Sequence, residues 1–331
     1  MKLDVRYKYS TKNNHRTMNE KKLQAKSSFE KKLQSLAMRN LSCVLCGQKD
    51  FKVVSEIDRY GFYYPTGICN NCGHIQQTKY YNQKFIDLFY KEYYGIIYRS
   101  EIDPEKHFYS SYKKGAVYSE IIKRVKKDVN HILDVGCASG GLLKGLADNF
   151  MAESMGLDYE TDLSRHAKEK GLNILYGKLE DYKLQQKFDL ITLSHVLEHL
   201  INPVKTIEFL KEMLKPGGII FIEVPSVDNI LNGAYNFDIL SYFQNMHIHH
   251  FTVNNLKNIF YLNNMEIIYI DQKSRLIAKI SNSMNSKNIK VNFQNSIELL
   301  SAIENKRKSR ANQFKIWLRK IKILIKKTYN I

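Results

Sequence analysis

The chain has 331 residues, is 44% hydrophobic and carries a formal net charge of +18. This length suffices for one core domain of about 170 residues with additions at both ends. No stretch approaches the roughly 18 continuous apolar residues of a membrane span, and the N-terminus lacks the apolar segment of a secretory signal. We therefore expect a cytoplasmic protein.

The positive charge is concentrated at the two ends. Residues 1–40 hold 11 Lys or Arg and 3 Asp or Glu, and residues 305–331 hold 10 Lys or Arg and no acid. The 264 residues between them contain 30 basic and 30 acidic side chains. We expect a basic N-terminal extension over 1–40. The part of the chain between the two ends thus has no net charge. This makes a nucleic-acid partner less favoured, because enzymes that act on RNA usually line their catalytic face with Lys and Arg.

Residues 41–80 contain two C-x2-C-G pairs separated by 22 residues. Each pair can present two thiolates from one tight turn, and four thiolates make a closed tetrahedral zinc site. Such a site has no open position for water and is structural. The predicted metal ligands are Cys43, Cys46, Cys69 and Cys72.

The segment that follows is rich in aromatic residues. Eleven of the 22 tyrosines lie between Tyr60 and Tyr112. Two interpretations stay open for residues 81–117: a small helical linker with an aromatic core, or a lid whose rings stack on a sugar or a base.

Residues 131–158 carry the most informative pattern. An apolar strand, Ile132–Val135, runs into a glycine-rich turn, an apolar helix follows over Leu142–Phe150, and a second strand ends at Asp158. This is the first half of a nucleotide-binding βαβ unit, in which the glycines allow a tight turn and close approach of a ligand. Asp158 is placed to bind the hydroxyls of a ribose.

An acid on the last turn of the first strand indicates which nucleotide is bound. Asp134 precedes Gly136 and Gly140. A carboxylate there is a poor neighbour for a pyrophosphate and a good one for a cation, such as the ammonium or sulfonium of S-adenosylmethionine. The alternative is a Rossmann domain that binds another nucleotide or none.

The same residues resemble motif I of the class I S-adenosylmethionine-dependent methyltransferases, and later segments extend the resemblance. FDLITLSHVLEHLINP (188–203) is similar to the fourth strand of that family and the turn after it, and LKEMLKPGGIIFIEVPS (210–226) to its helix, turn and fifth strand. The resemblance implies an α/β, Rossmann-like sheet of seven strands, the last antiparallel, over 118–281. The cofactor-binding residues that these patterns imply are Asp134, Gly136, Gly140, Asp158, Leu179 and His195.

The string His195-Val-Leu-Glu198-His199 also matches the inverted zinc-protease motif. That motif needs a long helix, and Asn202-Pro203 interrupts one here. The string is common after the fourth strand of small-molecule methyltransferases. We expect Glu198 and His199 to brace the turn and His195 to approach the cofactor.

The loop after the fifth strand contains Tyr242, His247, His249 and His250. Histidine is the natural base near neutral pH, and we predict that His247 or His249 is the general base, beside Tyr242. A zinc module joined to this core resembles the sugar C-methyltransferases, which carry a His-Glu-His stretch here. Ile248 replaces the glutamate. The expected acceptor is a small molecule, a sugar, sugar nucleotide or glycan intermediate, with O- and C-methylation both open.

Two other functions remain as alternatives: an RNA base methyltransferase and a non-catalytic, methyltransferase-like binding protein. Residues 282–331 are predicted to form a basic helical tail. In its segment 311–327, apolar residues recur at helical spacing among lysines and arginines. Such a helix either contacts an anionic membrane surface or packs on the core.

Overall fold

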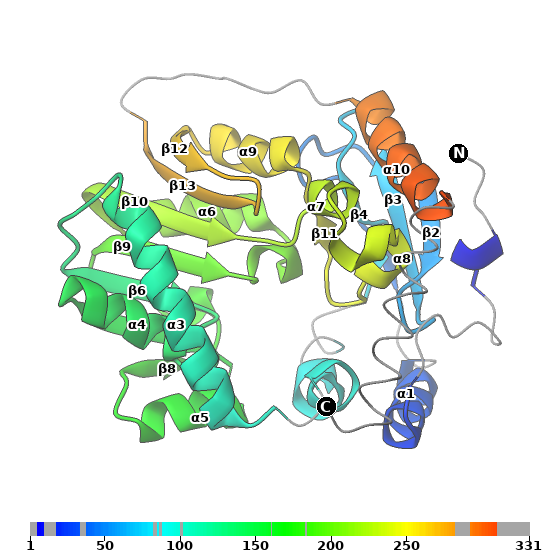
Figure 1. Ribbon diagram of the computed structural model, residues 1–331. Helices are drawn as coiled ribbons and strands as arrows, with labels where there is room; N and C mark the ends of the chain where they lie inside the picture. Colours follow the sequence, from blue (N-terminus) through cyan, green and yellow to red (C-terminus); the bar gives the residue numbers. More distant parts are fainter. Residues whose placement is uncertain are drawn as a thin grey trace.

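The computed structural model describes residues 5–9, 18–33, 38–81, 85, 88–99, 102–159, 161–182, 184–281 and 292–309. A seven-stranded and a four-stranded sheet form two neighbouring parts (Figure 1). The strands are β1 (Arg39–Asn40), β2 (Phe51–Ile57), β3 (Tyr63–Cys69), β4 (Ile75–Gln77), β5 (Lys79–Tyr80), β6 (His131–Val135), β7 (Glu153–Asp158), β8 (Ile174–Tyr176), β9 (Phe188–Ser194), β10 (Leu214–Glu223), β11 (His249–His250), β12 (Met265–Ile270) and β13 (Arg275–Ile280).

The α-helices are α1 (Glu20–Leu33), α3 (Pro104–Lys123), α4 (Gly141–Phe150), α5 (Asp162–Glu169), α6 (Pro203–Glu212), α7 (Val227–Leu231), α8 (Ile239–Tyr242), α9 (Val253–Leu262) and α10 (Phe293–Lys308). Shorter or wider helical turns are η1 (Val5–Tyr7), η2 (Phe89–Tyr93), η3 (Gly95–Arg99), η4 (Leu179–Asp181), η5 (Leu197–His199) and η6 (Ala234–Phe237).

The large sheet has the strand order β12-β13-β10-β9-β6-β7-β8. Its strands β8, β7, β6, β9 and β10 are parallel, whereas β13 is antiparallel to both β10 and β12. Residues of α6 and α9 cover one face, and residues of α3, α4 and α5 cover the other (Figure 1). The predicted seven-stranded sheet with an antiparallel last strand is confirmed.

Close packing of α3 on α4 fixes the start of this unit. A side chain at Gly115 would meet the backbone of Gly145 at 2.8 Å, so only glycine permits the contact. Helix α3 begins at Pro104, after Asp103 as its N-cap. The unit therefore begins before the boundary predicted at residue 118.

The small sheet has the order β11-β4-β3-β2 and joins distant parts of the chain. Strands β2 to β4 come from the cysteine-containing segment, and β11 comes from the loop after β10. Helix α10 packs on this sheet, where Leu300 and Ile303 are buried in a cluster with Tyr64 and Ile68. The loop that was predicted to carry catalytic histidines thus contributes a two-residue strand, β11, to the sheet of the N-terminal module.

The aromatic-rich segment forms a core. Phe85, Phe89 and Tyr93 are buried against Phe29 of α1, with ring centroids of Phe29 at 5.3, 4.8 and 4.8 Å from theirs. This supports the interpretation as a small subdomain with an aromatic interior. Tyr94, on the edge of this cluster, also lines the cavity described below.

The predicted amphipathic helix over 311–327 lies outside the described residues, and so does most of the basic extension before residue 18. Within the part of the chain that the structure describes, no helix combines the length and apolar character needed to cross a membrane.

Candidate functional site

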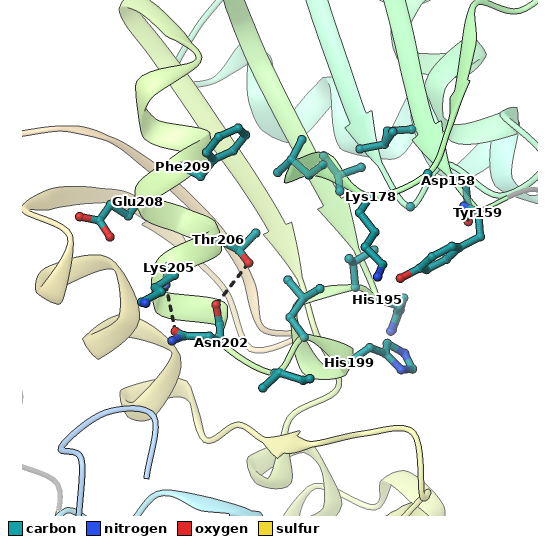
Figure 2. A pocket seen from close by; sticks show the side chains of 18 of the residues that line it. Asp158, Tyr159, Lys178, His195, His199, Asn202, Lys205, Thr206, Glu208 and Phe209 are labelled. Atoms are coloured by element: carbon teal, nitrogen blue, oxygen red, sulfur yellow. Dashed lines mark hydrogen bonds between the residues drawn. The ribbon is translucent and has the colours of Figure 1, made fainter. Parts of the chain in front are cut away.

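A cavity of about 870 Å³ opens at the carboxyl ends of β6, β7, β8 and β9 (Figure 2). In open α/β sheets this is the edge where ligands bind. Figure 2 shows Asp158, Tyr159 and Lys178 toward one side of the cavity and the residues of α6 toward the other. Its lining includes Tyr94, Gly136, Asp158, Leu179, His195, His199, Asn202, Lys205, Glu208 and Glu212.

The glycine turn after β6 has the backbone that the sequence indicates. Gly136 and Gly140 have φ angles of +75° and +73°, which favour glycine. A side chain at Gly136 would meet Val196 at 2.3 Å, and one at Gly140 would meet Leu172 at 2.3 Å. Gly136 lines the cavity, whereas Gly140 packs toward α5 and acts through the shape of the turn.

Asp158 ends β7 at the cavity wall. Its Oδ2 accepts a hydrogen bond from the Ala138 backbone at 2.6 Å, and its Oδ1 accepts one from the Tyr159 backbone at 2.7 Å. These bonds hold the carboxylate against the glycine turn. Leu179, at the start of η4, is another predicted cofactor-binding residue that lines the cavity.

We expect Asp158→Ala to weaken S-adenosylmethionine binding by roughly tenfold or more, as for loss of a charged hydrogen bond. Isothermal titration calorimetry measures this. Asp162→Ala is the matched control, because Asp162 is a well-exposed acid at the start of α5 and does not line the cavity. Parental affinity in Asp158→Ala would remove this residue from the cofactor site.

Asp134 is 1% exposed, and its Oδ1 accepts a hydrogen bond from the Thr192 hydroxyl at 2.6 Å. Its Oδ2 is buried without a hydrogen-bond partner. Burial raises the pKa of Asp134 to about 7, and the nearby Asp158 charge adds to the rise. Asp134 is not among the residues that line the cavity, so any influence on a ligand acts through the field of its charge.

A cation bound near Asp134 would lower the pKa of that carboxyl and release its proton. With a starting pKa of about 7, binding of S-adenosylmethionine at pH 6.5 should release up to about 0.8 proton. Calorimetry in buffers of different ionisation enthalpy counts this proton. Asp134→Asn should abolish the release. Equal proton release by Asp134→Asn and the parent would assign the proton to another group.

His195 follows β9 with a φ angle of +59°, in the left-handed region that is uncommon for non-glycine residues. Its side chain is 47% exposed and lines the cavity. Nε2 lies 3.4 Å from Glu223 Oε2, and Nδ1 lies 3.6 Å from Glu198 Oε1. Two carboxylates therefore flank an imidazole that faces the ligand space.

Glu223, at the end of β10, anchors this arrangement. Its Oε2 accepts hydrogen bonds from Lys114 Nζ at 3.1 Å, from Ser194 Oγ at 3.3 Å and from the Tyr118 hydroxyl. Because three donors hold the carboxylate, His195 has a fixed acidic neighbour on the side of Nε2.

His199, in η5, lines the cavity, although the sequence predicts only that it braces the turn after β9. Its Nδ1 lies 3.0 Å from the Met246 carbonyl, which can only accept, so Nδ1 is the protonated nitrogen. The H-x-x-E-H string after β9 was the available signal. One turn of helix after that strand brings both histidines to the cavity.

The structure does not bring the predicted base residues to this cavity. His249 is 1% exposed and pairs with His74, Nδ1 to Nε2 at 3.0 Å, while Tyr242 is 1% exposed and donates to the Pro225 carbonyl at 3.2 Å. His247 is 8% exposed and lies behind His199, with ring centroids 4.8 Å apart. The physical reason is the pairing of β11 with β4, which buries this loop.

Burial also makes these loop histidines poor bases. It lowers the pKa of His249 to about 4 and that of His250 to about 3. Burial and the neighbouring His199 hold the pKa of His247 well below its usual range. Groups with such a low pKa take up a proton weakly near pH 7.

The four cysteines of the N-terminal module converge as predicted. All their sulfur atoms lie within 4.8 Å of one another, with Cys43 Sγ 3.4 Å from Cys72 Sγ and Cys46 Sγ 3.5 Å from Cys69 Sγ. Ligands 2.3 Å from a tetrahedral zinc ion are about 3.8 Å apart, so this cluster fits zinc. Cys137, by contrast, is buried in the core of the large sheet.

Residues 109–270 match the family model described as "Methyltransferase domain". This stretch contains the glycine turn, Asp158, His195 and most of the large sheet. The match supports an S-adenosylmethionine-dependent methyltransferase domain over this stretch.

Among curated proteins, it is similar to the ubiquinone biosynthesis O-methyltransferase of Actinobacillus pleuropneumoniae serotype 5b, 37% identical over 102 residues, which is 27% of this chain and 43% of that enzyme. The mitochondrial enzyme of the same description from Dictyostelium discoideum is 30% identical over 109 residues, 28% of this chain and 34% of that one. The chain thus spans less than half the length of these relatives.

Among solved structures, a S-adenosylmethionine-dependent methyltransferase from Clostridium acetobutylicum has a TM-score of 0.42 and 15% identity, and the match covers 60% of this chain and 99% of that chain. A score of this size leaves the acceptor undefined.

Proposed function

We propose that the protein transfers a methyl group from S-adenosylmethionine to a hydroxyl of a small, sugar-linked acceptor. One observation carries this: a single cavity of about 870 Å³ is lined both by the predicted cofactor residues and by His195. That volume is at the upper end of the roughly 300–1,000 Å³ of ligand pockets, so it can hold a cofactor and a small acceptor together.

Gly136, Asp158 and Leu179 define the cofactor side of the cavity. Asp158 binds the ribose, and Leu179 packs on the adenine. S-Adenosylmethionine supplies a methyl group on a sulfonium, so that transfer breaks a carbon–sulfur bond and forms an oxygen–carbon bond. The residues of the chain must hold the acceptor oxygen in line and remove its proton.

His195 is the proposed general base, in place of His247 or His249. It lines the cavity at the end of β9, and its side chain is half exposed to the ligand space. The acceptor hydroxyl gives its proton to the imidazole as its oxygen bonds to the methyl carbon. Glu223 and Glu198 then stabilise the imidazolium, since each lies within 4 Å of a ring nitrogen.

The polar lining of the cavity supports a hydroxyl-rich acceptor. Asn202, Lys205, Glu208 and Glu212 come from the start and one face of α6. Mixed amide, cationic and carboxylate groups can bond to several hydroxyls. The resemblance to sugar methyltransferases favours a sugar-linked compound in particular.

A phenolic acceptor is the second candidate, because the curated relatives bear the name ubiquinone biosynthesis O-methyltransferase. Their similarity covers only 27% and 28% of this chain. More than two thirds of this chain therefore lies outside either match. A sugar-linked acceptor therefore remains the first candidate.

Mass spectrometry with isotope-labelled S-adenosylmethionine separates these functions. Purified protein is incubated with a panel of nucleotide sugars, with dihydroxyphenols and with ribosomal RNA. A labelled methyl ether on a nucleotide sugar is the expected result. A product only on a phenol or on RNA would replace the acceptor class, and binding of the cofactor without any product across all panels would favour a non-catalytic binding protein.

We also propose that the four cysteines bind a structural zinc ion. The four sulfurs lie close enough to share one ion, and two of them, Cys46 and Cys72, are only partly buried, so a metal can reach them. The ion would join the turn after Cys43, which precedes β2, to the turn after Cys69, which follows β3.

A further inference from the structure

A carboxylate and two imidazoles converge behind the wall of the cavity. The possible ligand atoms of Glu198, His199 and His247 all lie within 4.8 Å of one another. Glu198 and His199 belong to η5, directly after β9, and His247 belongs to the loop before β11. Two separate segments of the chain therefore meet at this point, and one of the three residues, His199, lines the cavity.

Glu198 is the least expected member of this group. It is 1% exposed, and neither carboxylate oxygen has a hydrogen-bond partner. The ring nitrogens of His195 and His199 approach its Oε1 only to 3.6 and 3.8 Å, which is too long for hydrogen bonds. A buried carboxylate without hydrogen bonds is costly unless a cation compensates its charge.

The two histidines present the matching donors. The Nδ1 of His199 donates to the Met246 carbonyl at 3.0 Å, so in the neutral ring the lone pair is on Nε2, the nitrogen that faces Glu198. Metal-binding histidines typically hold a carbonyl with their other nitrogen in this way. The Nδ1 of His247 is buried without a hydrogen-bond partner.

The spacing suits a shared ion. Two ligand atoms about 2.1 Å from a tetrahedral ion are about 3.4 Å apart. The distance of 3.8 Å between His199 Nε2 and Glu198 Oε1 is close to this value and needs only a small shift.

We propose that Glu198, His199 and His247 bind a divalent transition-metal ion whose open side faces the acceptor end of the cavity. Two imidazoles and one carboxylate favour Zn²⁺, Mn²⁺, Co²⁺ or Fe²⁺ over Mg²⁺ and Ca²⁺. Three protein ligands leave at least one position open, unlike the four sulfurs of the N-terminal module.

The role of this ion rests on the proposed methyl transfer. An acceptor hydroxyl in the open position would lose its proton more readily, because a bound cation stabilises the alkoxide. The proton passes to His195, whose Nδ1 lies 3.6 Å from Glu198 Oε1. Metal binding itself does not depend on the identity of the acceptor.

The test is a metal titration of the full chain. The protein is first loaded with one equivalent of Zn²⁺ to fill the four-cysteine site, and Mn²⁺ or Co²⁺ is then added in a calorimeter at pH 7.5. We expect one further site per chain. The spectrum of bound Co²⁺ should show nitrogen and oxygen ligands and no thiolate band.

Glu198→Gln and His247→Asn should each weaken binding of the second metal ion at least about 100-fold. Loss of a residue that only supports a metal ligand costs about 10–100-fold in metal affinity, so loss of a ligand should reach or exceed the upper end of that range. His131→Asn is the matched control, because His131 lies at the amino end of β6, whereas the cavity lies at the carboxyl ends of the strands. Circular dichroism and S-adenosylmethionine affinity report whether each variant folds.

Failure of the wild type to bind a second ion would overturn the proposal whatever the variants do. Parental binding in both folded variants, or a bound Co²⁺ with thiolate ligands only, would also overturn it. Because these readouts need no acceptor, they are independent of the proposed function. If a second ion binds and no acceptor is methylated, the metal site stands and the methyl transfer falls.

Discussion

Replacement of His195 by asparagine is expected to lower turnover by roughly 100-fold or more while S-adenosylmethionine affinity stays near its parental value. General bases contribute about that much to proton removal. Asparagine is the informative substitution, since it tolerates the left-handed backbone that His195 adopts at φ +59° and cannot take up the proton. The measurement is single-turnover methyl transfer to whichever acceptor the mass-spectrometric panel identifies.

Two companion variants sharpen this result. His131→Asn, at the opposite end of β6, should keep parental turnover. His249→Ala removes one of the two loop histidines predicted as the base and should lower thermal stability, because His249 is buried against His74. If His249→Ala, while still folded, loses turnover and His195→Asn does not, the loop histidine is the base after all.

Removal of one zinc ligand should have the largest effect on stability. A structural zinc site is worth of the order of 10 kcal/mol in small zinc domains. We expect Cys46→Ser to unfold the small sheet under conditions in which the parent is folded. Zinc released by a thiol-modifying mercurial should be about one ion per parent chain and none from Cys46→Ser.

Cys137→Ser is the control for that experiment. Cys137 is buried in the core of the large sheet, between α4 and the strands, and takes no part in the four-sulfur cluster. It should keep its zinc. S-Adenosylmethionine binding should persist in Cys46→Ser, since Gly136 and Asp158 belong to the other sheet. A parent protein that releases no zinc would contradict the zinc site.

The large sheet and the cofactor side could be predicted because their signals are local. A glycine turn, an acid at a strand end and continuous apolar strands each act within a few residues, and β6, α4 and β7 appear where the sequence placed them. The start of α3 is also encoded locally, by Asp103 and Pro104, which lie before the domain boundary predicted at residue 118.

The placement of the loop histidines could not be predicted in the same way. Strand β11 has two residues, His249 and His250, and its partner β4 lies in another module. No periodic pattern of two residues indicates such a pairing. The orientation of His199 could not be predicted for a related reason. Its ring is held by the Met246 carbonyl, whose position depends on where that same loop lies.

The β4–β11 pairing has a consequence for how the chain is made. His249 pairs with Gln76, so more than 170 residues separate the partners. At a synthesis rate of about 5–20 residues per second, β4 waits on the ribosome for roughly 10–35 seconds with one edge uncovered. An open edge of this kind invites pairing with other chains. An ion captured early by the four cysteines would hold the nascent hairpin in shape during that interval, so zinc supply during translation should govern how much of the protein escapes aggregation.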